Sequence, residues 1–252
     1  MFPPESRARR KRSCFPAAAI PYSRPENKAV AQASGISSAA SEAENGGTAT
    51  SKASLGSTAE AIADTAKTTA TASGEKAEAT AVVLGGTGKA TASGANSSAE
   101  SLIEKAGGGN VISVAVAGGQ AVAVIPSGGG GNATAHATGL GLAEAAVEGG
   151  TASATANGAS SVAASEVVSG NGKSTASNGG EAVAAVEADC KVQANASGSG
   201  SIAEGTCTIA GSAITVQATK GSEAVGSDTS PPMCTPVNGG IAKVHSPMVD
   251  CG

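Results

Sequence analysis

The chain has 252 residues with 36 Gly, 1% aromatic and 14% charged residues, and a formal net charge of −4. Ala supplies most of the apolar residues. One buried Ala methyl contributes about 0.8 kcal/mol, against about 1.5–3 kcal/mol for Leu or Phe, so the composition excludes a conventional two-layer core. The sequence has no apolar run of roughly 18 residues that could span a membrane, and its acidic body without aromatic side chains argues against nucleic-acid binding.

The first 45 residues differ in composition from the rest and are expected to form a disordered leader. Residues 1–28 carry a net charge of +5 and contain every Arg of the chain. The segment Met1–Ala31 begins like an export signal, and its last three residues resemble a small-residue cleavage site. The apolar stretch between these parts is short and broken by prolines, so the segment is not a convincing export signal.

Residues 46–188 form an Ala/Gly/Ser-rich repeat region. Ala alternates with Thr, Ser, Lys or Glu, which gives an extended strand one small apolar face and one polar face. Glycines close these runs roughly every ten residues. Short strands are therefore expected at residues 79–83, 114–117 and 121–125, with glycine turns between them.

The repeat can be measured within this region. Gly86–Ser101 laid on Gly150–Ser165 matches at 10 of 16 positions, and Gly170–Ser177 is a further copy. The offsets from Gly86 are 64 and 84 residues, both close to multiples of 21. This pattern predicts an all-β solenoid with about two short strands per coil. Roughly eight coils between Gly46 and Gly205, spaced by about 4.8 Å, would make a rod of about 40 Å.

A disordered chain is the alternative for this region, because high Gly, Ser and Ala content is also typical of disorder. Two observations favour the solenoid. A disordered chain has no need for strict alternation, and the Val and Ile residues are concentrated in the expected strands.

Residues 189–252 are expected to form a C-terminal cap that covers the open end of the solenoid. Further strands are expected at residues 206–210, 213–218 and 241–244. Four cysteines lie in this segment: Cys190, Cys207, Cys234 and Cys251. Two disulfides are expected, with three connectivities open and Cys190–Cys207 with Cys234–Cys251 preferred; four free thiols are the alternative. Disulfides indicate an oxidising compartment, hence a secreted or cell-envelope location.

Two glycine-rich motifs resemble nucleotide-binding loops but fail their tests. Gly85–Lys89 lacks the leading glycine of a phosphate-binding loop, and Ala90 replaces its hydroxyl residue. Gly198–Ala203 has the glycine spacing of a dinucleotide loop without a following helical pattern. No cofactor is therefore expected.

Residues for acid-base or metal chemistry are few. His136 and His245 are the only histidines, and His245 lies near Ser246 and Asp250 in sequence. Adjacency in sequence is not the signature of a catalytic triad. The cysteines lack the close C-x-x-C spacing of a zinc site, and the aspartates lack the spacing of calcium-binding repeats. We assign no catalytic, cofactor-binding or metal-binding residue and expect a protein that is not an enzyme.

Outward Thr rows give the chain a possible binding surface. Thr48 with Thr50, Thr69 with Thr71, and Thr151 with Thr155 would project from one face of flat strands, as an ice-binding surface requires. Lysines and glutamates at outward positions, Lys52, Lys76, Glu78, Lys89 and Lys173, are expected to interrupt these rows. A polysaccharide surface is a second candidate ligand, although carbohydrate sites commonly use aromatic platforms, which this region lacks.

Two resemblances to known proteins support a non-enzymatic role. The A-x-A-x-x-G rhythm between Gly46 and Ser201 resembles the head repeats of trimeric autotransporter adhesins, which implies a β-roll and an oligomer. Gly226–Thr229, Pro231–Cys234, Gly239–Val244 and Cys251 are similar to the ends of Ala/Gly/Ser-rich exported proteins of actinobacteria, which implies a cell-envelope or secreted location.

The sequence thus predicts a secreted or cell-surface structural protein of the adhesion type. A cell-envelope or surface polymer is the expected partner. The alternatives are a module that binds ice or polysaccharide and a disordered envelope spacer.

Overall fold

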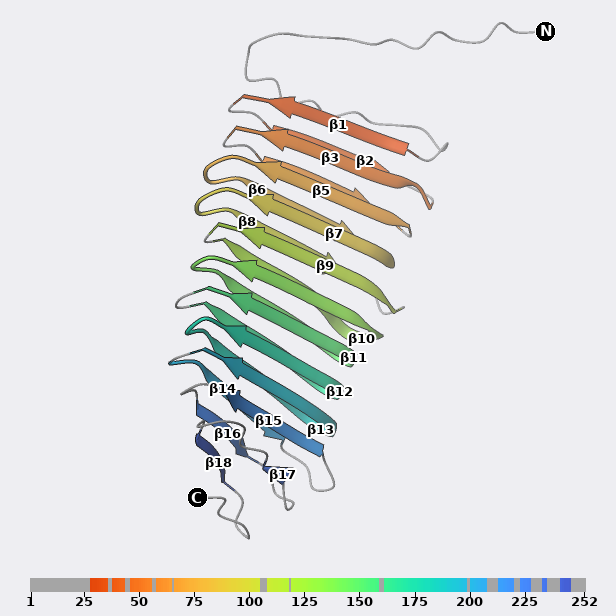
Figure 1. Ribbon diagram of the computed structural model, residues 1–252. Helices are drawn as coiled ribbons and strands as arrows, with labels where there is room; N and C mark the ends of the chain where they lie inside the picture. The colour runs from red at the N-terminus through yellow and green to blue at the C-terminus, as the bar shows by residue number, and fades with distance from the viewer. Residues whose placement is uncertain are drawn as a thin grey trace, which may run out of the picture.

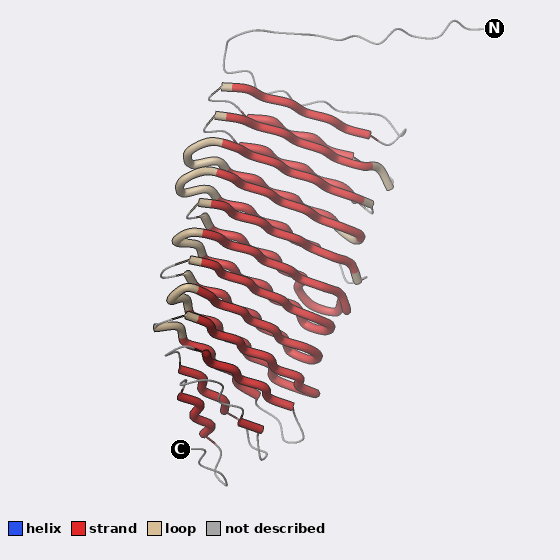
Figure 2. Tube along the Cα trace, viewed as in Figure 1, coloured by secondary structure: helices blue, strands red, loops and turns tan. Residues whose placement is uncertain are grey.

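The computed structural model describes residues 28–35, 38–43, 46–55, 58–64, 66–104, 108–117, 119–158, 161–198, 200–207, 213–219, 223–227, 233–234 and 241–245. Every regular element among them is a β-strand (Figure 2). The first nine strands are β1 (Lys28–Ser34), β2 (Ser38–Ala43), β3 (Thr48–Ser54), β4 (Thr58–Ala63), β5 (Lys67–Ser73), β6 (Glu78–Val83), β7 (Gly86–Ser93), β8 (Ser98–Ile103) and β9 (Gly109–Val116). They are followed by β10 (Gln120–Thr138), β11 (Leu142–Asn157), β12 (Val162–Ser177), β13 (Glu181–Ser197), β14 (Ile202–Cys207), β15 (Ala213–Thr219), β16 (Glu223–Ser227), β17 (Met233–Cys234) and β18 (Ile241–His245).

These strands form a parallel β-solenoid with two strand segments per coil, as the repeat predicts (Figure 1). Stack 1 contains β1, β3, β5, β7, β9, the second segments of β10–β13, β15 and β17. Stack 2 contains β2, β4, β6, β8, the first segments of β10–β13, β14, β16 and β18. The strands β10–β13 are long because each continues around a corner from stack 2 into stack 1.

The register explains the internal sequence matches. Gly86 pairs with Gly109, which pairs with Gly131 and then with Gly150, so the 64-residue offset is three coils. Gly150 pairs with Gly170, so the 84-residue offset is four coils. The expected eight coils between Gly46 and Gly205 are confirmed by the strands of stack 1 from β3 to β13.

The strand pairing extends beyond both expected domain boundaries. β1 and β2 belong to the first coil, so the solenoid includes residues 28–34 and 38–43 of the expected leader. At the other end, β13 crosses residue 189, and β14 and β15 continue the same two stacks. The alternation of Ala with polar residues is already present in β1 and β2, and this is the physical reason that they join the sheet.

The interior is narrow because Ala fills it. One inward position of stack 2 is Ala in nine consecutive strand segments, and all nine side chains are buried: Ala39, Ala59, Ala79, Ala99, Ala121, Ala143, Ala163, Ala182 and Ala203. The two stacks approach closely enough for serine hydroxyls to bridge them. The Oγ atoms of Ser41 and Ser51 lie 2.8 Å apart, and Ser101 Oγ donates to the carbonyl of Ile112 at 2.9 Å.

Glycines at one corner make room for the larger interior side chains. Gly86, Gly109, Gly131, Gly150 and Gly170 form a ladder in stack 1, and a Cβ on any of them would lie within 2.4 Å of a carbonyl oxygen of the preceding coil. Gly109 also faces Ile103, whose Cδ1 would lie 2.7 Å from such a Cβ. The inward Val and Ile residues of stack 2 lie beside this ladder. Because glycine has no side chain, the interior has room for these larger residues at this corner.

Candidate functional site

The outward side chains of stack 1 form a basic, hydroxyl-rich surface, which we call the Lys face. Its six lysines are exposed: Lys28, Lys52, Lys67, Lys89, Lys173 and Lys191. Thr, Ser, Asn and Gln occupy most of the other outward positions. The described strand segments of stack 1 contain no Glu, and their one acidic residue is Asp189, which lies in the irregular pairing at the corner before Lys191 of β13. This face is therefore predominantly basic.

The outward side chains of stack 2 form the opposite surface, which we call the Glu face. From β2 to β14 it carries eight exposed glutamates: Glu42, Glu60, Glu78, Glu100, Glu144, Glu166, Glu181 and Glu204. The described strand segments of stack 2 over this range contain no Lys or Arg. The Ala-filled interior separates the two faces, so the lysines and glutamates of one copy point in opposite directions.

An apolar strip runs along the Glu face, across the strands. Ile62, Val82, Leu102 and Val124 are in register on β4, β6, β8 and β10, and each is partly exposed. Glu42 precedes Ile62 in this column. Among the described residues, no second layer covers this row, because the buried core lies on the other side of these strands.

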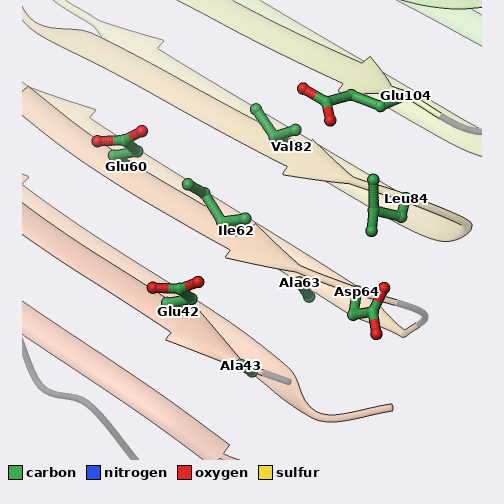
Figure 3. Close-up of a pocket in the computed structure, with 9 residues that line it drawn as sticks. All are labelled: Glu42, Ala43, Glu60, Ile62, Ala63, Asp64, Val82, Leu84 and Glu104. Atoms are coloured by element: carbon green, nitrogen blue, oxygen red, sulfur yellow. The ribbon is translucent and has the colours of Figure 1, made fainter. Parts of the chain in front are cut away.

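A groove lies beside the apolar strip (Figure 3). Its volume is about 600 Å³. The carboxylates around it come from Glu42, Glu60, Asp64 and Glu104, and its apolar lining includes Ile62, Val82 and Leu84. A second hollow of about 340 Å³ continues along the face near Val124, Glu148 and Val168. Both hollows combine apolar and acidic side chains, which suits a partner that is apolar and cationic.

The predicted Thr rows lie together on the Lys face. Thr48 and Thr50 are on β3, and their register partners Lys67 and Thr69 are on β5, where Thr71 follows. Two of the residues expected to interrupt these rows lie elsewhere, because they belong to the corner and to the other stack. Lys76 is in a turn, and Glu78 starts β6 on the Glu face. Lys52, Lys89 and Lys173 do lie on the Lys face.

The predicted disulfide residues cannot be paired from the structure. Cys190, Cys207 and Cys234 are in β13, β14 and β17, but their side chains fall outside the described part of the chain, as does Cys251 entirely. The backbone places Cys207 opposite Val186, in the coil after the one that contains Cys190. Cys207 therefore precedes the corner, Cys190 follows the equivalent corner of the preceding coil, and their disulfide remains a prediction.

The residues considered for catalysis are not brought together among the described residues. His136 is exposed on the Lys face, where its register partners are Val114 and Thr155. His245 ends β18, and Ser246 and Asp250 lie outside the described residues. Within the described ranges, no group of three or more His, Cys, Asp or Glu side chains is placed to hold a metal ion.

The glycine-rich motif that resembles a phosphate-binding loop forms part of a strand. Gly86–Lys89 is extended backbone within β7, where Gly88 packs inward between Thr68 and Val111 and Lys89 points outward. The backbone amide of Thr87 donates to the carbonyl of Ala66 at 2.9 Å. This motif is therefore a strand start, without the cradle of free amides that binds phosphate.

The separation of charge onto two faces is a feature that the sequence reasoning missed. A signal was available, since Lys and Glu fall in alternate segments of about ten residues: Lys52 and Lys67 lie in segments that flank the one containing Glu60. Sorting charges by segment, once the two-strand coil is assumed, would have found it.

We found no family model, curated protein or solved structure that matches this chain. The resemblances to adhesin head repeats and to exported actinobacterial proteins therefore remain predictions. Among the described residues, no helix has the length and apolarity needed to cross a membrane.

Proposed function

We propose that this chain is a non-enzymatic structural protein of the adhesion type, secreted or held in the cell envelope, whose Lys face binds an extended surface polymer. The observation that carries the proposal is the Lys face itself. It is an array of ammonium, hydroxyl and amide groups that runs without a carboxylate from β1 to the second segment of β12 in stack 1.

The chemistry of this face favours an anionic polymer. Six lysines on a rigid surface produce a positive potential that attracts a polyanion and concentrates it near the protein. Each exposed ion pair contributes little, about 0.2–1 kcal/mol, but a long polymer contacts several coils at once. Thr and Ser hydroxyls and Asn amides, such as those of Thr134 and Asn132 on β10, supply hydrogen bonds between the charged contacts.

The first experiment compares binding of the full chain to beads carrying an anionic polysaccharide, alginate, and to beads carrying neutral dextran. The test variant replaces Lys52, Lys67 and Lys89 by Gln. The matched control replaces Glu60, Glu100 and Glu144 by Gln, which changes the same number of charges on the other face.

We expect the wild-type chain to bind alginate more tightly than dextran. The Lys variant should bind alginate about tenfold more weakly, because each of the three lost contacts contributes about 0.5 kcal/mol. The Glu control should keep the wild-type affinity for alginate. Equal affinities of the two variants, or no preference for alginate, would overturn the proposal.

Ice binding is a second candidate, favoured by the threonine array on β3, β5 and β7. Thr50 and Thr69 are register partners, as are Thr71 and Thr91, so their side chains repeat along the axis at the spacing of about 4.8 Å between coils. Thermal hysteresis measurements decide this point. Freezing-point depression that is lost in Thr50→Lys would support ice binding, whereas its absence in the wild type would exclude it. We do not propose the third alternative, a disordered envelope spacer, because the repeat region forms a β-solenoid.

A further inference from the structure

We propose that copies of this chain stack face to face, with the Glu face of one copy docked on the Lys face of the next. The first argument is charge. Eight exposed glutamates and six exposed lysines lie on opposite sides of the solenoid. This separation does not stabilise a single copy. If Lys and Glu alternated on one face instead, they would form cross-strand ion pairs, and the repulsion between like charges would be smaller. Two copies placed Glu face to Lys face satisfy both arrays.

The second argument is the apolar strip. Ile62, Val82, Leu102 and Val124 form one unpartnered row on the Glu face. The Lys face carries apolar surface that can cover it, because β9 presents Ile112, Val114 and Val116 outward, and Val116 is 40% exposed. The methyl groups of outward threonines such as Thr91, the β7 partner of Val114, extend this surface. The same pair of faces therefore matches apolar surface as well as charge.

The third argument is area. Nine strand segments of six residues, from β2 to β14, make a face of about 20 Å by 38 Å at about 3.3 Å per residue and 4.8 Å per strand. Complete overlap of two aligned copies would thus cover about 760 Å² on each, close to the roughly 800 Å² per partner of a standard stable interface. Packed sheets usually lie about 10 Å apart, and this is the separation expected between two docked copies.

The pairing determines the kind of assembly. The two contacting surfaces are different, so the contact is heterologous, and each added copy leaves one Lys face and one Glu face free. The result is an open stack rather than a closed dimer. Pairing of two identical faces would bring like charges together, which is unfavourable. The Lys face at the end of a stack remains free for a surface polymer, and the inference does not depend on what that polymer is.

The test is sedimentation velocity of the full chain, over a range of concentrations and without any polymer. We expect the average mass to rise with concentration at low salt and to fall to that of one chain in about 1 M salt, where the screening length is about 3 Å. An open stack gives a continuous series of masses. A single closed dimer, or a mass that stays at one chain at low salt, would overturn the inference.

Charge reversal makes the test specific. One variant carries Lys52→Glu, Lys67→Glu and Lys89→Glu, which leaves three lysines against three new glutamates and so removes the net positive charge of the Lys face. The other carries Glu60→Lys, Glu100→Lys and Glu144→Lys, which leaves five of the eight glutamates against three new lysines and so removes most of the negative charge of the Glu face. We expect each variant alone to associate at least about tenfold more weakly than the wild type. An equimolar mixture should associate again, because the unchanged Glu face of the first variant can dock on the unchanged Lys face of the second.

Controls separate docking from general effects of charge and from loss of folding. Glu75→Lys changes a charge in a corner turn and should leave stacking unchanged. Leu102→Thr removes part of the apolar strip without changing charge and should weaken stacking. Circular dichroism verifies that each variant keeps its β-structure. Association of the mixture would show that both variants are folded. If both variants are folded and their mixture does not associate, the inference is wrong. Alginate is absent throughout, so this outcome is independent of the polymer-binding test.

Discussion

Two neighbouring glycines offer a direct test of the narrow corner. Gly86 has φ +124°, and a Cβ added to it would lie 2.2 Å from the carbonyl oxygen of Ala66. Gly85 has no atom within 4 Å of its added Cβ. The two substitutions Gly86→Ala and Gly85→Ala therefore make the same chemical change one residue apart, one in a crowded position and one in open space.

We expect Gly86→Ala to lower the free energy of unfolding by about 2–4 kcal/mol. A non-glycine residue at such a φ costs about 1–3 kcal/mol. Relief of the contact moves the chain away from Ala66, and this weakens the hydrogen bond from the Thr87 amide to the Ala66 carbonyl, worth about 1 kcal/mol. Gly85→Ala should be neutral, or stabilising by up to about 1 kcal/mol, because Ala restricts the unfolded chain.

Hydrogen exchange followed by mass spectrometry is the assay, supported by urea unfolding. Each coil of a solenoid contacts its neighbours, so the loss should be largest in the amides of β5, β7 and β9 and smaller in distant coils. Equal protection of β7 in the two variants would refute the reasoning, because it would mean that the corner accepts a Cβ at Gly86.

Three further predictions concern the interior and the cysteines. Ala145→Leu should destabilise the chain by about 1–3 kcal/mol through overpacking, while Ala146→Leu, one residue away on the outward side, should cost much less in thermal unfolding. Thr68→Val should stabilise the chain by about 1 kcal/mol in urea unfolding, because the buried Thr68 Oγ1 has no hydrogen-bond partner. Peptide mapping of the oxidised chain should find Cys190 linked to Cys207, and reduction should cost about 3 kcal/mol for a loop of this length; a different pairing would contradict the corner placement.

The strands could be predicted from sequence because two local signals agree. Ala at alternate positions defines the inward face, as in β5 and β6, and glycine marks the corners. The offsets of 64 and 84 residues revealed the coil, since copies three and four coils apart occupy equivalent positions.

The two charged faces could not be found with a constant repeat length. Adjacent coils are offset by 20 residues between Glu78 and Ser98 but by 23 between Gly86 and Gly109. Corners absorb the extra residues while the strands stay in register, so a fixed period of 21 places side chains in the wrong columns. The positions of Gly85 and Gly86 at the corner could not be predicted from sequence either. They look alike in sequence, and only the path of the preceding coil distinguishes them.

The direction of the hydrogen bonds has a mechanical consequence. The ladder bonds between coils run along the axis of the solenoid, as the stacked strands in Figure 1 show. Tension applied between the two ends would therefore load the coils in series, and the weakest coil would detach first. Each detached coil of 20 residues would lengthen the chain by about 65 Å at up to 3.6 Å per residue. Under load, the protein would behave as an extensible tether that lengthens in steps, and docking of copies side by side would resist this extension.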